Sequence, residues 1–82
     1  MVTWEMPDGT EFRYLGGAAS NAALREFVLR FMSAEGTSWD VSRWDDSELE
    51  GAFLRRFGEE IRIRRERSTL GSTVLVFQPV GA

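Results

Sequence analysis

A cluster of acidic side chains is the group of residues in this sequence best placed to do chemistry. The cluster comprises Asp40, Asp45, Asp46, Glu48 and Glu50. Clustered carboxylates can bind a hard cation or transfer protons. This cluster, however, lacks the alternating acids and the central glycine of a calcium loop. Acids also gather at the start of a helix, where they cap free amides and face the positive end of the dipole. We therefore expect a helix start here and no bound metal.

The residue types that the chain lacks exclude most catalytic chemistries. It contains no histidine and no cysteine, and all ten of its basic residues are arginine. Without these types there is no imidazole base, no thiolate nucleophile, no usual zinc or haem ligand and no Schiff-base lysine. Carboxylates, serines without a histidine partner and Tyr14 remain. We expect a non-catalytic protein without a cofactor.

Two tryptophans flank the acidic stretch and make it a candidate contact surface. Burial in the core is the default interpretation for both. A short segment that combines tryptophan, arginine and acids nevertheless has the composition of an interaction hot spot. The residues predicted to contact a protein partner are Trp39, Asp40, Trp44, Asp45, Asp46 and Glu48.

An arginine-rich segment near the C-terminus is the second candidate contact. It contains Arg62, Arg64, Arg65 and Arg67. Four arginines at this spacing could neutralise several phosphates of a nucleic acid. Glutamates are interleaved with them, so cross-strand ion pairs or contact with an acidic protein explain them equally well. Two helices followed by an arginine-rich hairpin loosely resemble a winged helix-turn-helix, but the link 36–45 is too long and too aromatic for that family's turn. Nucleic acid is therefore the alternative partner.

Length and composition indicate one small folded domain, residues 1–82. The chain has ten aromatic residues and a net charge of −3. That charge is divided unevenly, with −6 on residues 1–54 and +3 on residues 55–82. Such a division predicts a dipolar surface. A homo-oligomer is possible through an unpaired sheet edge, as in other small sheets.

Origin and location are also predicted from composition. The absence of lysine is typical of codon bias in a high-GC bacterium or its phage. No apolar run approaches the ~20 residues that span a bilayer, and the first residues do not resemble a signal peptide. We expect a cytoplasmic protein that inhibits, adapts or regulates a larger protein without contacting a membrane.

The local patterns predict two hairpins and two helices. Segments 2–6 and 10–15 alternate apolar and polar residues around Pro7-Asp8-Gly9, which predicts a β-hairpin. An apolar stripe predicts a helix that begins at Ser20 or Asn21 and continues to about Ala34. The stripe consists of Leu24, Phe27, Val28 and Phe31.

The second half of the chain completes the predicted fold. Residues 37–44 could be a short strand or an ordered loop, and a helix over 46–57 should follow, ending at Gly58. The last hairpin turns at 68–71, and Val74–Phe77 is apolar on both faces, so we place it centrally in the sheet. The predicted fold is α+β, a two-layer sandwich of order ββ-α-(β)-α-ββ. Its sheet is mostly antiparallel with four or five strands, and both helices cover one face.

Overall fold

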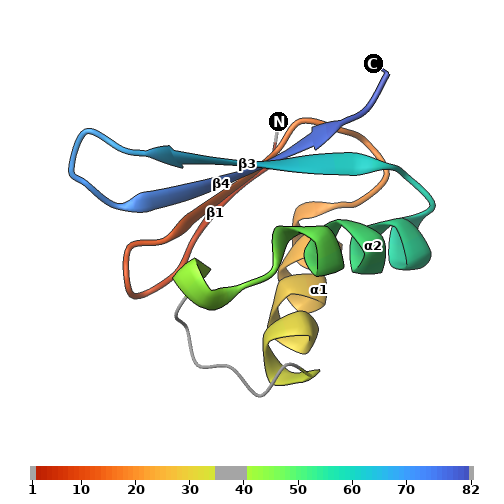
Figure 1. The fold of residues 1–82 in the computed structure, drawn as a ribbon, viewed down its shortest axis with the longest axis horizontal. Coiled ribbons are helices and arrows are strands. Elements are labelled where there is room, and N and C mark those ends of the chain that lie inside the picture. The colour runs from red at the N-terminus through yellow and green to blue at the C-terminus, as the bar shows by residue number, and fades with distance from the viewer. Residues whose placement is uncertain (1, 35–40, 82) are drawn as a thin grey trace.

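The computed structural model describes residues 2–34 and 41–81, and in these ranges the fold is α+β. A four-stranded sheet carries both α-helices on the same side (Figure 1). The elements, in chain order, are β1 (Val2–Glu5), β2 (Glu11–Tyr14), α1 (Asn21–Ala34), the 3-10 turn η1 (Val41–Arg43), α2 (Asp46–Phe57), β3 (Ile61–Arg67) and β4 (Thr73–Pro79).

The predicted first hairpin is confirmed. The Met6 N–H donates to the Thr10 carbonyl at 2.8 Å, and the Gly9 N–H donates to the Met6 carbonyl at 2.9 Å. Gly9 closes the turn at φ +93°, a conformation that glycine adopts without strain. Trp4 lies opposite Phe12 across the hairpin. The hairpin therefore fixes the register of the first two strands locally.

Both predicted helices are also confirmed, together with their caps. The Ala23 N–H donates to the Ser20 hydroxyl at 3.1 Å, which makes Ser20 the cap of α1. Asp45 caps α2 with its carboxylate. Gly58 ends α2 in the left-handed conformation at φ +73°. The boundaries predicted from sequence hold because capping signals are local.

The strand order and strand directions differ from the sequence expectation. Among the described residues the sheet has four strands in the order β1-β2-β4-β3, and it is mixed rather than mostly antiparallel, because β2 and β4 run parallel. The Leu15 N–H donates to the Phe77 carbonyl, and the Val80 N–H donates to the Glu60 carbonyl. The end of β2, the start of β3 and the end of β4 therefore meet at one end of the sheet. The helical segment returns the chain to that end, so β3 starts there and runs antiparallel to the direction of β2. The hairpin after β3 then reverses the chain, which makes β4 parallel to β2.

The central position of β4 is confirmed. Leu75 and Phe77 belong to the core beneath the helices, whereas Val74 and Val76 point to the face that no helix covers. Both valines are nevertheless at most 2% exposed. Charged residues of β2 and β3 pair beside them, namely Glu11, Arg13, Arg64 and Glu66. The helix-free face, which we call the open face, is thus a charged layer over two buried valines.

Aromatic rings fill the space between sheet and helices. Phe53 of α2 lies 5.4 Å from Tyr14, 5.5 Å from Phe27 and 5.8 Å from Phe77, measured between ring centroids. These contacts join two strands and two helices around one ring. Apart from Val74 and Val76 on the open face, the described buried apolar residues form one cluster. The core therefore depends on contacts between elements far apart in the sequence.

The segment 37–44 is described only in part. Residues 37–40 lie outside the described residues. Of the two alternatives predicted for this segment, a strand or an ordered loop, Val41–Arg43 form no strand but a 3-10 turn. None of the described helices has the length and apolar character needed to cross a membrane.

Candidate interaction surfaces

Trp44 was predicted as a contact residue, but its ring lies in the core. The side chain is 6% exposed and packs at 5.4 Å from Phe31 and 6.0 Å from Phe12. Its indole Nε1 is buried, and no hydrogen-bond partner is found for it among the described residues. The ring is therefore almost fully covered, as the default interpretation from the sequence expected, and contact with a partner through Trp44 stays a prediction. Trp39 and Asp40 lie outside the described residues.

Asp45 and Asp46 of the predicted acidic surface act within the fold. Asp45 Oδ1 accepts the Ser47 and Glu48 N–H groups at 2.9 and 3.3 Å, which caps α2. Asp46 binds the Arg65 guanidinium, with Nη2 to Oδ1 at 2.8 Å and Nε to Oδ2 at 3.1 Å. The structure thus joins an acid from one predicted surface to an arginine from the other.

The Asp46–Arg65 ion pair also fastens two elements together. Arg65 Nη2 donates to the Trp44 carbonyl at 3.3 Å, so one guanidinium holds the start of α2 against β3. About a third of each side chain remains exposed, 32% for Arg65 and 36% for Asp46. Solvent therefore screens the pair and limits its contribution to stability. The role of this arginine is to position α2.

Glu48, like Asp45, is an exposed member of the predicted acidic set. It lines a groove between the two helices, beside Ser47, Gly51 and Arg55 of α2. The groove floor includes Phe27 of α1, which belongs to the core. Among the predicted acids that the structure describes, Glu48 has a carboxylate that remains available to a partner.

The four predicted arginines do not form one surface. Alternation along β3 places Arg62 and Arg64 on the open face, and Arg65 and Arg67 on the helix side. Arg62 pairs with Glu60 at 3.4 Å. Arg64 pairs with Glu66 at 3.3 Å and donates to the Gln78 amide oxygen at 3.0 Å. The Arg67 Nη1 donates to the Gly71 carbonyl at 3.2 Å. The arginines are divided between faces, and three of them pair with acids of the same chain.

Tyr14 is a further residue with reactive potential, and it lies in the core. Its hydroxyl donates to Glu59 Oε1 and accepts the Ala18 N–H at 2.8 Å. Burial and the Glu59 carboxylate raise the pKa of Tyr14 above its ordinary value of 10.0. The hydroxyl thus ties the end of β2 to the segment before α1 and to the start of β3. Its contacts are those of a structural group.

A surface that the sequence did not predict lies between α1 and the outer edge of β1. We call it the α1–β1 surface, and its lining residues are Trp4, Glu5, Met6, Pro7, Arg25 and Leu29. The Arg25 guanidinium carbon lies 5.6 Å from the centroid of the Trp4 ring, within the range of a cation–π contact. Leu29 is 38% exposed although it is a large apolar residue.

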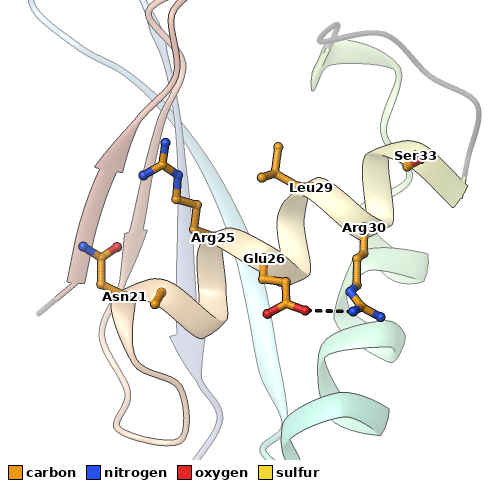
Figure 2. Close-up of a pocket in the computed structure, with 7 residues that line it drawn as sticks. Asn21, Arg25, Glu26, Leu29, Arg30 and Ser33 are labelled. Carbon is orange, nitrogen blue, oxygen red and sulfur yellow. Dashed lines mark ion pairs between the residues drawn. The ribbon is translucent and has the colours of Figure 1, made fainter.

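The side chains of α1 define one border of this surface. Figure 2 shows Arg25 and Leu29 projecting from the same side of α1, while Glu26 and Arg30 project from another side and form an ion pair at 2.9 Å. The signal available in the sequence was Leu29, because it lies off the apolar stripe of this helix. Its meaning depends on Trp4, which only the fold brings next to α1.

The two edges of the sheet are protected differently. At the β3 edge, the Ile63 N–H donates to Glu50 Oε2 of α2 at 2.8 Å, so a helix side chain occupies an edge donor. Charged arginines along the same strand also discourage pairing with another strand. At the β1 edge, the α1–β1 surface borders the strand instead. Among the described elements, β1 is therefore the edge that is open to pairing.

Within residues 2–34 and 41–81, no group of three or more His, Cys, Asp or Glu side chains could hold a metal ion. Comparison of the chain with models of protein families, with curated proteins and with solved structures found no match.

Proposed function

We propose that this chain is a non-catalytic protein-interaction module, a small inhibitor, adaptor or regulator that acts by binding a protein. The observation that carries the proposal is the α1–β1 surface. It combines the exposed Leu29 with a partly buried tryptophan and an arginine beside an open strand edge. Tryptophan and arginine are the residue types most enriched at binding hot spots.

The side chains available in the chain support a non-catalytic role. Histidine, cysteine and lysine are absent from the sequence. The Tyr14 hydroxyl, which could act as an acid, is engaged with Glu59 and the Ala18 amide. Asp45 and Asp46 have structural partners as well. The Tyr14 hydroxyl and these two carboxylates are thus engaged in holding the fold.

The main contact with the partner lies at the α1–β1 surface and not at the acidic start of α2. Asp45 caps α2 through Oδ1 and Asp46 pairs with Arg65, so both carboxylates already have structural roles. Glu48 keeps its place as a secondary contact. Action in the cytoplasm of a bacterium or of its phage stays part of the proposal and rests on composition alone.

A matched pair of leucine variants tests the proposal. Leu29→Asp places a charge in the α1–β1 surface, and Leu54→Asp places the same charge on α2, where the leucine is similarly exposed, at 44%. Both variants should stay folded by circular dichroism, because both leucines already meet water. With the chain immobilised and lysate proteins identified by mass spectrometry, Leu29→Asp should lose the captured partner and Leu54→Asp should keep it. Equal capture by both variants would refute the proposed surface.

A further inference from the structure

The open β1 edge is complementary to β1 itself. We propose that two copies of the chain pair through β1, antiparallel around a two-fold axis, so that one continuous sheet runs through a dimer. This inference rests on the proposed function, because it uses the α1–β1 surface and names a second copy as the partner.

The hydrogen bonds of the first hairpin determine which backbone groups the edge offers. The Met6 N–H donates to the Thr10 carbonyl, so Met6 and Thr10 form a hydrogen-bonded pair. Antiparallel pairs alternate between hydrogen-bonded and non-hydrogen-bonded types. The backbone groups of Trp4 therefore face β2, while those of Thr3 and Glu5 face outward. The edge offers two donors and two acceptors with the spacing of a β ladder.

One register uses all of these groups. It places Thr3 opposite the second copy's Glu5, and Glu5 opposite the second copy's Thr3. A shift in one direction places Glu5 opposite Glu5, which opposes like charges, and Thr3 opposite Pro7, which has no N–H. A shift in the other direction pairs Thr3 with Thr3 and leaves Glu5 beyond the end of the second copy's β1.

The charges on the open face agree with this register. They form two rows across the sheet, an acidic row of Glu5, Glu11 and Glu66 and a basic row of Arg13 and Arg64. Thr3 lies at the end of the basic row, opposite Arg13. Pairing Thr3 with the second copy's Glu5 makes the basic row of one copy continue into the acidic row of the other. The face is therefore complementary to itself across the two-fold axis.

The apolar side of β1 fits the same arrangement. In this register Trp4 lies directly opposite the second copy's Trp4, at a non-hydrogen-bonded position where side chains come closest. Both rings lie on the helix side of the sheet, because Trp4 stacks on Phe12 at 5.1 Å and its ring faces Arg25 of α1. Each Trp4 would enter the α1–β1 surface of the other copy, where Leu29 is exposed. Cross-strand aromatic pairs of this kind stabilise sheets.

The interface is small because β1 has four residues. Strand pairing with one aromatic pair falls among the weak, transient interfaces, so the dimer should depend on protein concentration. Analytical ultracentrifugation of the unmodified chain over a concentration series should show a reversible monomer–dimer equilibrium. Sedimentation as a monomer up to millimolar concentration would overturn the inference.

Cysteine cross-linking tests the register, because the chain has no cysteine of its own. In the proposed register, Cys at position 3 faces Cys at position 5 of the other copy. The Cα atoms of such a pair lie about 5.5 Å apart, a distance that a disulfide spans. Mild oxidation of Thr3→Cys mixed with Glu5→Cys should give a disulfide heterodimer, and each variant alone should cross-link far less. Equal cross-linking in all three samples would overturn the register.

Charge variants at Thr3 separate dimerisation from monomer stability. Thr3 is exposed and lies opposite Arg13 within its own sheet, so Thr3→Glu favours the monomer fold and Thr3→Arg disfavours it. Across the dimer, position 3 faces Glu5, so Thr3→Arg should strengthen dimerisation and Thr3→Glu should weaken it, each by about two- to five-fold. If Thr3→Glu dimerises more tightly than Thr3→Arg, dimer affinity follows monomer stability and the proposal is contradicted.

The outcomes also distinguish this inference from the proposed function. Loss of a foreign partner with Leu29→Asp in a chain that sediments as a monomer supports the proposed function and overturns the dimer. A dimer cross-linked in the predicted register supports the inference. Equal capture of lysate proteins by both leucine variants refutes only the proposed contact with a foreign partner.

Discussion

The hydrogen bonds of Tyr14 are the clearest case of a single side chain that holds distant parts of the fold together. Tyr14 is fully buried, and its hydroxyl connects Glu59 with the Ala18 amide. Removing one partner of a buried hydrogen bond costs about 1–3 kcal/mol, because the other partner is left unsatisfied. We expect Tyr14→Phe to lower the free energy of unfolding by that amount in urea denaturation. An unchanged free energy would show that water replaces the hydroxyl.

The same residue predicts how stability depends on pH. The pKa of Tyr14 is raised by burial and by Glu59, so above about pH 10 the unfolded chain loses this proton while the folded chain keeps it. The folded state then binds more protons, and the free energy of unfolding falls as pH rises. Tyr14 is the only tyrosine, so its phenolate absorbance reports on this group alone. Tyr14→Phe should lose this part of the alkaline decline.

Gly16 lies where no larger residue fits. A Cβ atom added there would lie 2.6 Å from both the Tyr14 hydroxyl and Glu59 Oε1, and 2.8 Å from Pro79 Cγ. We expect Gly16→Ala to destabilise the fold by about 1–3 kcal/mol, the usual cost of overpacking. Gly17→Ala is the matched control, because a Cβ at Gly17 meets nothing within 4 Å. Thermal melts should therefore separate the two variants, and equal melting temperatures would contradict the crowding.

At the scale of elements, the sequence predicts what local chemistry decides. Pro7-Asp8-Gly9 specifies a turn, Asp45 and Gly58 specify the ends of α2, and Val74–Phe77 specifies a central strand. The parallel pairing of β2 and β4 is not local. It depends on α2 returning the chain to the end of the sheet where β2 stops, and no pattern within a single element encodes that.

The candidate site shows the same division. Asp46 and Arg65 are recognisable as charged candidates, but they are nineteen positions apart, and nothing in either segment predicts their ion pair. The sequence left Trp44 open as a core residue or a contact residue, and long-range packing against Phe12 places its ring in the core. The α1–β1 surface was missed because Leu29 and Trp4 belong to elements that only the fold brings together.

The cap of α2 gives a prediction at this scale. Asp45 accepts two backbone N–H groups with one carboxylate oxygen. Asp45→Ala should lower the free energy of unfolding by about 0.5–2 kcal/mol. Asp45→Asn keeps a capping oxygen and should lower it by only about a few tenths of a kcal/mol. Chemical denaturation of both variants measures the difference. If a partner binds Asp45 through its charge, Asp45→Asn will lose binding without losing stability.

At the scale of the whole molecule, folding reduces the charge asymmetry of the sequence. The chain carries −6 on residues 1–54 and +3 on residues 55–82. The sheet and the Asp46–Arg65 pair bring these halves together, and Glu60 and Glu66 pair with arginines of the same segment. The surface therefore interleaves both signs, which does not favour long-range attraction to a polyanion.

This charge pairing leads to a prediction about nucleic acid. Binding to phosphates requires cations that are free to release counterions. Arg62 and Arg64 share the open face, but each already pairs with a glutamate. Fluorescence anisotropy should therefore detect no binding of the wild-type chain to duplex DNA near physiological salt, about 0.15 M.

A variant that lacks the paired glutamates should gain the DNA binding that the wild-type chain lacks. Glu60→Gln with Glu66→Gln frees Arg62 and Arg64 from their ion pairs, and it should produce weak binding to duplex DNA at low salt. The log of its affinity should fall with the log of salt concentration with a slope of at most about −2, since each phosphate contact contributes about −0.9. The matched control adds Arg62→Gln and Arg64→Gln and should abolish this binding. Wild-type binding with a slope of several units would contradict the proposed protein-interaction role, because it would require a basic surface that the internal ion pairs oppose.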